Sequence, residues 1–285
     1  MIILPIMQTP TVSSTTHDAM TATGQPRVNA DLSLEVKNVV VRFGGVVALD
    51  GVSFGIPREK IIALIGPNGA GKTTLFNCIS RLYTPSSGDV LYCGKSLLRM
   101  SAHQVAHAGI GRTFQNLALF QGLSVTDNIK IGTHIRTRGK LLSDALRMPL
   151  SRKAKADAMV IADQLISYLD LESVASIKVN DLPFGTQKRV ELARALATQP
   201  SLLLLDEPAC GLNHEEVIEL GQMIQRIRAD FRLTVLLVEH HMGLVMSISD
   251  HIIALNFGRQ IAEGTPEEIQ RHPDVIGAYL GGAST

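Results

Sequence analysis

A glycine-rich stretch, GPNGAGKTT, occupies residues 66–74, directly after the apolar run IIALI and before the apolar-periodic segment KTTLFNCISRL. The order of strand, glycine loop and helix is a recurring supersecondary unit, and the loop has the spacing GxxxxGK[ST]. Glycines let the backbone curl so that successive N–H groups and the helix N-terminus face an anion. The stretch therefore predicts a phosphate-binding loop within an α/β fold.

Two residues of this loop carry functional side chains. Lys72 is expected to reach the terminal phosphates of a nucleotide, and the hydroxyl of Thr73 is expected to bind Mg²⁺. The rest of the loop would surround the phosphates, and it consists of Gly66, Pro67, Asn68, Gly69, Ala70, Gly71 and Thr74. A nucleotide loop alone does not distinguish a kinase, a GTPase or a transport ATPase.

A second chemical signal is the acidic pair Asp206 and Glu207, which follows the continuous apolar run SLLLL. Such a run is typical of a parallel strand that is buried on both faces, and parallel strands end at the crevice where ligands bind. Hydrolysis of a nucleotide needs one group that holds Mg²⁺ and another that orients or deprotonates water. Asp206 suits the first role and Glu207 the second.

The order of secondary-structure signals predicts the fold class. Three short Val-rich runs after residue 31, LSLEV, VVVRF and VALDGVSFGI, predict an N-terminal antiparallel β layer. Strand signals are sparse between about 117 and 185, where we expect an inserted helical subdomain. Strands and helices then alternate, which predicts a parallel α/β sheet. Combined with the phosphate loop, this sheet predicts a P-loop NTPase core. Thr265 and Glu268 form a capping-box pattern, with Pro266 at the first helical position.

Composition and charge exclude several classes of protein. The 285 residues include 27 basic and 26 acidic side chains, so no global field favours nucleic acid. The apolar runs IIALIG, SLLLL and TVLLV are far shorter than the roughly 20 residues that a membrane helix needs.

Three cysteines without a CxxC pair indicate reduced thiols in a cytosolic compartment. Residues 1–31 are rich in Thr, Ser and Pro, and we expect a disordered N-terminal tail.

Five motifs in this order resemble those of the nucleotide-binding subunits of ATP-binding cassette (ABC) transporters: GPNGAGKTT, RTFQN, LPFGTQKRVELARALA, LLLLDEP and VEHH. The resemblance covers about residues 32–280. It implies one ABC ATP-binding domain over 32–282 with ATP and Mg²⁺ as ligands, and no second copy is visible. It also implies a peripheral position on the cytoplasmic face of the plasma membrane, beside two transmembrane permease subunits.

The resemblance implies roles for single residues as well. Phe43 lies where the family places an aromatic ring that stacks on adenine, although a β-strand core residue would look the same in a sequence. Gln115 would contact Mg²⁺ and the attacking water and would signal to the membrane subunits. Asp206 would hold the metal, directly or through a water molecule, and His240 would contact the γ-phosphate. His241 falls where many relatives carry Asp and is expected to be a surface neighbour.

His103 and His107 are four residues apart, which on a helix could form half of a zinc site. No third ligand is evident in the sequence. We therefore expect an exposed helix face rather than a metal site.

The family signature LSGGQ is replaced by LPFGT, formed by Leu182, Pro183, Phe184, Gly185 and Thr186. In the family, the serine at the position of Pro183 gives a hydroxyl to the γ-phosphate of ATP held by the opposite subunit, so that contact is lost. The N–H groups of Gly185 and Thr186 remain available to that anion. A helix expected to begin near Gln187 would add its N-terminus.

The loop after the acidic pair departs from the family pattern too. Cys210 and Asn213 replace a serine and an aspartate, which leaves open how this loop communicates across a dimer. With these departures, with GRTFQN and with the closing PDVIGAYLG, the sequence resembles one of the two ATPase subunits of branched-chain amino acid importers. That resemblance implies a second, nonidentical ABC ATPase as a head-to-tail partner, and a periplasmic or other extracytoplasmic solute-binding protein.

Several alternatives to a branched-chain amino acid importer can be weighed. An importer of another small amino acid or amide is one alternative. An ATPase that extracts lipopolysaccharide or lipid shares the catalytic motifs, but a serine in the signature would have favoured it over Pro183. A role with nucleic acid would require two cassettes, a coiled-coil insert or a basic patch, and the sequence shows none of these. A nonhydrolysing module would lack the glutamate of the acidic pair, and Glu207 is present.

Overall fold

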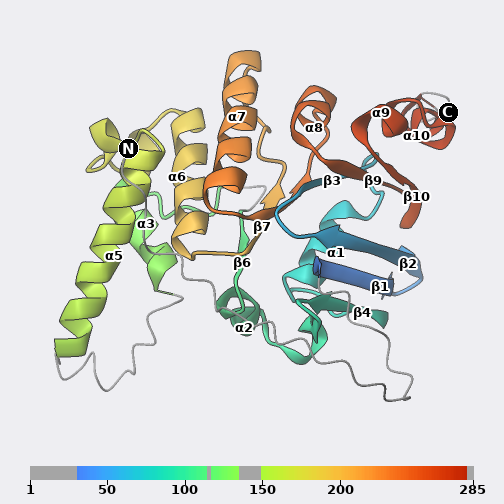
Figure 1. The fold of residues 1–285 in the computed structure, drawn as a ribbon, viewed down its shortest axis with the longest axis horizontal. Helices are drawn as coiled ribbons and strands as arrows, with labels where there is room; N and C mark the ends of the chain where they lie inside the picture. Colours follow the sequence, from blue (N-terminus) through green and yellow to red (C-terminus); the bar gives the residue numbers. More distant parts are fainter. Residues whose placement is uncertain (1–30, 114–116, 135–148, 281–285) are drawn as a thin grey trace, which may run out of the picture.

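The computed structural model describes residues 31–113, 117–134 and 149–280, and Figure 1 shows how their elements are arranged. Strands form one antiparallel sheet and one mostly parallel sheet, and helices pack around them. The predicted fold class, an α/β core with an N-terminal antiparallel layer, is confirmed.

The antiparallel sheet has the strand order β2-β1-β4-β5. Its strands are β1 (Leu32–Phe43), β2 (Val46–Pro57), β4 (Ser87–Tyr92) and β5 (Lys95–Ser96). The runs LSLEV and VVVRF, expected as separate strands, are both part of β1. Asn38 adopts a positive φ of 48° at a register shift, so the chain bulges there instead of ending the strand.

The second sheet has the order β10-β9-β3-β8-β7-β6. Its strands are β3 (Ile61–Ile65), β6 (Ile110–Arg112), β7 (Leu202–Asp206), β8 (Thr234–Val238), β9 (His251–Asn256) and β10 (Arg259–Gly264). All pairs are parallel except β9 with β10, which are antiparallel. Every residue of β3, β7 and β8 is buried, as the apolar runs predict for strands covered on both faces.

The helices begin and end at defined positions around these sheets (Figure 1). They are α1 (Lys72–Ile79), α2 (Ala102–His107), α3 (Val125–Thr133), α5 (Pro149–Tyr168), α6 (Phe184–Ala197), α7 (His214–Asp230), α8 (Met242–Ile248), α9 (Pro266–Gln270) and α10 (Pro273–Leu280). In the described part of the chain, 3₁₀ turns cover Leu97–Arg99, Glu172–Val174 and Val179–Asp181. The capping box predicted at Thr265 and Glu268 is present at the start of α9, with Pro266 in its first turn.

Helices α3 and α5 occupy the segment where we expected a helical subdomain, and α3 packs closely on α6. A Cβ on Gly132 would lie 2.3 Å from the carbonyl oxygen of Arg194, so the two helices approach there with no room for a side chain. A helix expected over residues 140–148 lies outside the described residues. The subdomain limits at 117 and 185 remain a prediction.

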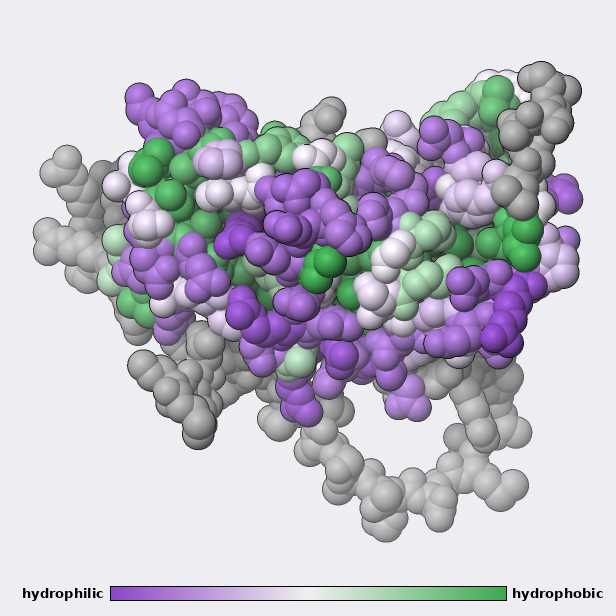
Figure 2. All heavy atoms as spheres, turned by 90° about the horizontal axis from the view of Figure 1, so that it is seen from above, coloured by the Kyte–Doolittle hydropathy of each residue, from purple (hydrophilic) through white to green (hydrophobic). Residues whose placement is uncertain are grey.

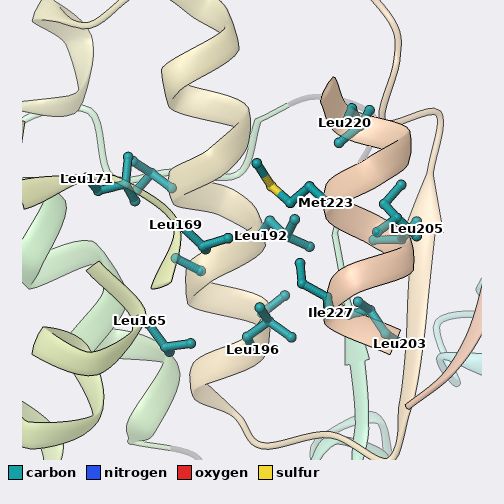
Figure 3. Close-up of a cluster of buried hydrophobic side chains, with 14 of the residues drawn as sticks. Leu165, Leu169, Leu171, Leu192, Leu196, Leu203, Leu205, Leu220, Met223 and Ile227 are labelled. Atoms are coloured by element: carbon teal, nitrogen blue, oxygen red, sulfur yellow. The ribbon is translucent and has the colours of Figure 1, made fainter. Parts of the chain in front are cut away.

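Strand β7 separates two hydrophobic clusters. Leu203 and Leu205 point to the cluster that contains α6 and α7, whereas Leu202 and Leu204 point to the cluster beneath the antiparallel sheet. Figure 3 shows the first cluster, with leucines of the α5 region and α6 meeting those of β7 and α7. Because successive side chains of a strand point to opposite faces, β7 contributes to both clusters and joins the two layers into one body.

No helix among the described residues is long and apolar enough to cross a membrane. Figure 2 shows hydrophilic side chains over much of the face seen from above, with hydrophobic groups scattered among them. The apolar residues of the sequence mainly form the cores just described.

We expect Leu196→Ala to lower the free energy of unfolding by about 2–5 kcal/mol, through lost transfer energy and a cavity. Leu196 is only 2% exposed and lies in the cluster of Figure 3. Denaturant unfolding followed by circular dichroism measures the change. The control is Ile218→Ala on α7, where the side chain is 49% exposed, with an expected change below about 0.5 kcal/mol. Equal effects of both substitutions would contradict this packing.

Candidate nucleotide-binding site

The predicted phosphate loop connects β3 to α1. Gly66, Gly69 and Gly71 have φ angles of 149°, 81° and 104°, which residues with a side chain rarely adopt. A Cβ on Gly71 would lie 2.7 Å from the carbonyl oxygen of Ala48 on β2. Gly71 is also the N-cap of α1 and gives no side-chain cap, so the first N–H groups of that helix are available to an anion.

The remaining loop residues fit the same interpretation. Ala70 is buried and donates its N–H to the Pro67 carbonyl at 3.1 Å, which closes the turn. Asn68 is exposed at the tip of the loop. Thr73 and Thr74 lie in the first turn of α1, and Thr73 is exposed, so its hydroxyl is accessible to a ligand.

Lys72 is almost fully buried beneath the loop. Its Nζ donates to the carbonyl oxygens of Gly66 at 2.6 Å and Pro67 at 3.1 Å. Burial lowers the pKa of Lys72, and the nearby carboxylates of Glu207 and Asp206 act in the opposite direction. The structure thus brings the predicted lysine and the acidic pair into one electrostatic environment, with the ammonium group resting on backbone oxygens.

Asp206, the last residue of β7, is 2% exposed and forms an ion pair that the sequence did not predict. Arg112, at the end of β6, donates from Nη2 to Asp206 Oδ2 at 2.8 Å. Arg112 also donates from Nη1 to Asn77 Oδ1 and Ser80 Oγ of the α1 segment, both at 2.9 Å. The only signal for this role was the place of Arg112 in a short strand before the TFQN motif.

The second carboxylate oxygen of Asp206, Oδ1, is buried and has no hydrogen-bond partner among the described residues. A buried carboxylate oxygen without a donor is costly. Divalent cations such as Mg²⁺ prefer oxygen ligands of this kind. The donor set of Asp206 and the exposed Thr73 hydroxyl therefore fits the predicted metal.

Glu207 follows at the first position beyond β7 with a positive φ of 47°, which is uncommon for a residue with a side chain. Its N–H donates to the Val238 carbonyl at 2.9 Å, which holds this conformation in place. Glu207 Oε2 lies 3.9 Å from Nδ1 of His240, whose side chain is 59% exposed. The predicted water-activating residue and the predicted γ-phosphate contact are therefore neighbours.

Glu239 is a functional candidate that the sequence analysis missed. It is fully buried between β8 and His240. Oε1 accepts from the Ala209 N–H at 2.8 Å, and Oε2 accepts from the N–H groups of His240 and His241 at 2.8 and 3.0 Å. One carboxylate therefore joins the loop that follows Glu207 to the loop that carries His240.

Phe43 ends β1 and is 47% exposed, so it is not a core residue. Its ring contacts Tyr83 edge to face, with centroids 5.3 Å apart. An exposed aromatic ring is compatible with stacking on a base, which remains a proposal.

The signature segment differs from expectation at the start of its helix. Helix α6 begins at Phe184 with Pro183 as N-cap, three residues before the predicted start near Gln187. The N–H groups of Gly185 and Thr186 therefore belong to the first turn, where a helix leaves its donors unpaired. No side-chain cap bond forms there.

The signature segment packs against the loop and helix that follow the acidic pair. Leu182 is buried, and the ring of Phe184 contacts Gly211, where a Cβ would lie 2.8 Å from Cε1. A Cβ on Gly185 would lie 2.7 Å from Oε1 of Glu216. Asn213, one of the departures from the family pattern, caps α7 in a reciprocal capping box with Glu216. The loop with exposed Cys210 is therefore braced by the signature segment.

Three further predictions have different outcomes. Gln115 lies outside the described residues. His103 and His107 lie exposed on α2 with their Nε2 atoms 2.9 Å apart, and no cluster of three metal-ligating side chains occurs among the described residues. His241, expected to be a surface neighbour, is exposed and caps α8, because its Nδ1 accepts from the Leu244 N–H at 3.2 Å.

A phosphate loop at the end of β3, with a buried acidic strand end beside its lysine, defines a P-loop nucleoside triphosphatase. The chain belongs to the ABC transporter family, whose model matches residues 49–210. It is therefore a transporter ATPase that binds ATP and works with membrane permease subunits. A second model, described as branched-chain amino acid ATP-binding cassette transporter, matches residues 259–285.

Curated relatives and solved structures agree with this membership. The chain is 41% identical over 250 residues to the high-affinity branched-chain amino acid transport ATP-binding protein BraF of Pseudomonas aeruginosa, and 42% identical to LivG of Escherichia coli. Each match covers 88% of this chain and 98% of the relative. A nucleotide-free ATP-binding cassette from an ABC transporter is similar with a TM-score of 0.76 and 29% identity, covering 87% of this chain and 98% of that one.

We expect Glu239→Ala to lower the free energy of unfolding by about 2–5 kcal/mol, because the buried Ala209 N–H and the part-buried N–H groups of His240 and His241 lose their acceptor. ATPase activity should fall as well, since two loops of the site lose their common anchor. Thermal unfolding and phosphate release measure these effects. The control, Glu219→Ala, removes the exposed partner of Arg189 and should cost no more than about 1 kcal/mol. Parent-like stability and activity of Glu239→Ala would contradict the role of Glu239.

Proposed function

We propose that this chain is the ATP-binding and ATP-hydrolysing subunit of an importer for branched-chain amino acids. The observation that carries the proposal is the identity of 41–42% to BraF and LivG over nearly their whole length. The C-terminal match at residues 259–285 supports the same substrate class. By contrast, identity to the sulfate/thiosulfate import protein CysA of Pseudomonas putida is 32%, and only 72% of that relative is covered.

The phosphate loop is proposed to bind the ATP phosphates through its backbone N–H groups. Lys72 would exchange the carbonyl oxygens of Gly66 and Pro67 for phosphate oxygens, which offer it full negative charge in place of dipoles. The exposed ring of Phe43 would stack on adenine. The Thr73 hydroxyl and Asp206 Oδ1 would hold Mg²⁺, with Asp206 acting directly or through a water molecule.

Hydrolysis is proposed to depend on Glu207, which would orient and deprotonate the attacking water. It directly follows Asp206, the proposed metal-binding residue, and His240 at 3.9 Å would contact the γ-phosphate. Gln115 would complete the water and metal contacts. Mg²⁺, when bound, supplies positive charge that neutralises the phosphate oxygens.

The second half of the site is proposed to come from another subunit. The first turn of α6, at Gly185 and Thr186, would bind the γ-phosphate of ATP held by the partner through N–H groups alone, because Pro183 has no hydroxyl. A cassette solved as a dimer bound to ADP and Pi, with 25% identity and a TM-score of 0.70, supports pairing of this fold. The pair we propose is a heterodimer of two nonidentical ATPases.

The other subunits that we propose are those that an importer needs. Closure of the ATPase pair on ATP, and its release after hydrolysis, would move two permease subunits between conformations. A periplasmic or extracytoplasmic solute-binding protein would deliver the amino acid. We place the chain at the cytoplasmic face of the plasma membrane as a peripheral subunit.

We expect Glu207→Gln to bind ATP but to hydrolyse it at least about 100-fold more slowly, because the amide cannot accept the proton of water. The ATP-bound protein should remain in a closed pair. Phosphate release and size-exclusion chromatography with ATP measure both effects. The control Glu267→Gln changes an exposed residue of α9 and should behave like the parent protein. Undiminished turnover of Glu207→Gln would contradict the assignment of Glu207.

A transport assay tests the substrate class. In a host without a duplicate system, loss of this chain should reduce uptake of labelled leucine, isoleucine and valine to background. The parent gene should restore uptake and the Glu207→Gln variant should not. Unchanged uptake after loss of the chain would contradict the proposed substrate and would favour one of the alternatives, such as lipid extraction.

A further inference from the structure

The C-terminal helix contacts the phosphate loop directly. Tyr279 of α10 accepts a hydrogen bond at its hydroxyl oxygen from the N–H of Gly66, at 2.9 Å across 213 positions of sequence. Gly66 is the first residue of the loop and is buried. Burial raises the pKa of the Tyr279 phenol, with the bond from Gly66 acting against this, so the hydroxyl is neutral at physiological pH.

Gly66 is a point where several contacts determine the shape of the loop. Its own carbonyl accepts from Lys72 Nζ at 2.6 Å. A Cβ at this position would lie 2.2 Å from the carbonyl oxygen of Leu255 on β9, so the backbone is pressed against the neighbouring strand. The N–H that Tyr279 binds lies on one side of the Gly66 Cα, and the oxygen that Lys72 binds lies on the other.

The helix that carries Tyr279 is fixed to the same strand that leads into the loop. Val275 of α10 and Ile269 of α9 lie in one buried cluster with Ala63 and Ile65 of β3. Tyr279 itself is 38% exposed, and the packing of its helix keeps the hydroxyl next to the end of β3. These C-terminal residues fall within 259–285, the segment that the branched-chain amino acid cassette model matches separately.

We propose that Tyr279 is a positioning residue of the ATP site, through which the C-terminal segment holds the first peptide of the phosphate loop in the conformation that receives ATP. Without the hydroxyl, the part-buried Gly66 N–H would lose this acceptor, and the peptide would turn to find another. ATP would then have to order the phosphate loop as it binds, and the free energy of ATP binding would be less favourable by the cost of that ordering. This role depends on ATP binding by the loop and not on the identity of the transported solute.

The test is Tyr279→Phe in the full chain, which keeps the ring and removes only the hydroxyl. We expect the Kd for ATP, measured by equilibrium titration, and the KM of the assembled transporter to rise roughly 3- to 10-fold, which is the effect of one hydrogen bond. The kcat should change less than about twofold, because the groups that act on water are untouched. Hydrogen exchange at the Gly66 amide should become faster.

Tyr168→Phe is the matched control, since it removes a tyrosine hydroxyl that donates to Asp230 on α7. It should leave both the Kd for ATP and exchange at Gly66 unchanged. A Kd of Tyr279→Phe within twofold of the parent would overturn the proposal, whether or not thermal stability falls. Failure of the parent protein itself to bind ATP would instead contradict the nucleotide site as a whole.

Discussion

Strand β8 pairs with β3 on one side and β7 on the other, and Val238 at its end is opposite both Leu64 and Asp206. This register aligns the ends of three strands whose residues are all buried. A slip of one residue would exchange the side chains between the two cores, so the register is strongly specified. Because of this register, the phosphate loop, the acidic pair and the loop that carries His240 meet at one edge of the parallel sheet.

Buried ionic groups then set the shape of the loops at that edge. Glu239 accepts hydrogen bonds from N–H groups of the loops after β7 and β8. Arg112, at the end of β6, donates hydrogen bonds both to α1 and to Asp206. A buried charge is costly unless its partners are all in place. These two residues therefore favour one arrangement of the loops at this edge, in which Glu207 keeps its left-handed backbone and lies beside His240.

Three elements that are distant in sequence hold the phosphate loop. Ala48 of β2 packs against Gly71, the turn between β9 and β10 donates the Gly258 N–H to the Ala70 carbonyl at 3.0 Å, and α10 reaches Gly66. A loop rich in glycine gains little order from its own side chains. Its conformation before ATP arrives is thus set by the N-terminal layer and by the C-terminal segment together.

The sequence by itself determined the phosphate loop, the acidic strand end and the order of strands and helices, because each depends on local residue type and periodicity. It placed the start of α6 near Gln187, whereas packing of Phe184 on Gly211 extends the helix by three residues. Only the tertiary structure brought Glu239, Arg112 and Tyr279 into contact with the loops of the candidate site. Their partners are far away along the chain or are backbone groups of other loops, and no local pattern of residues carries that information.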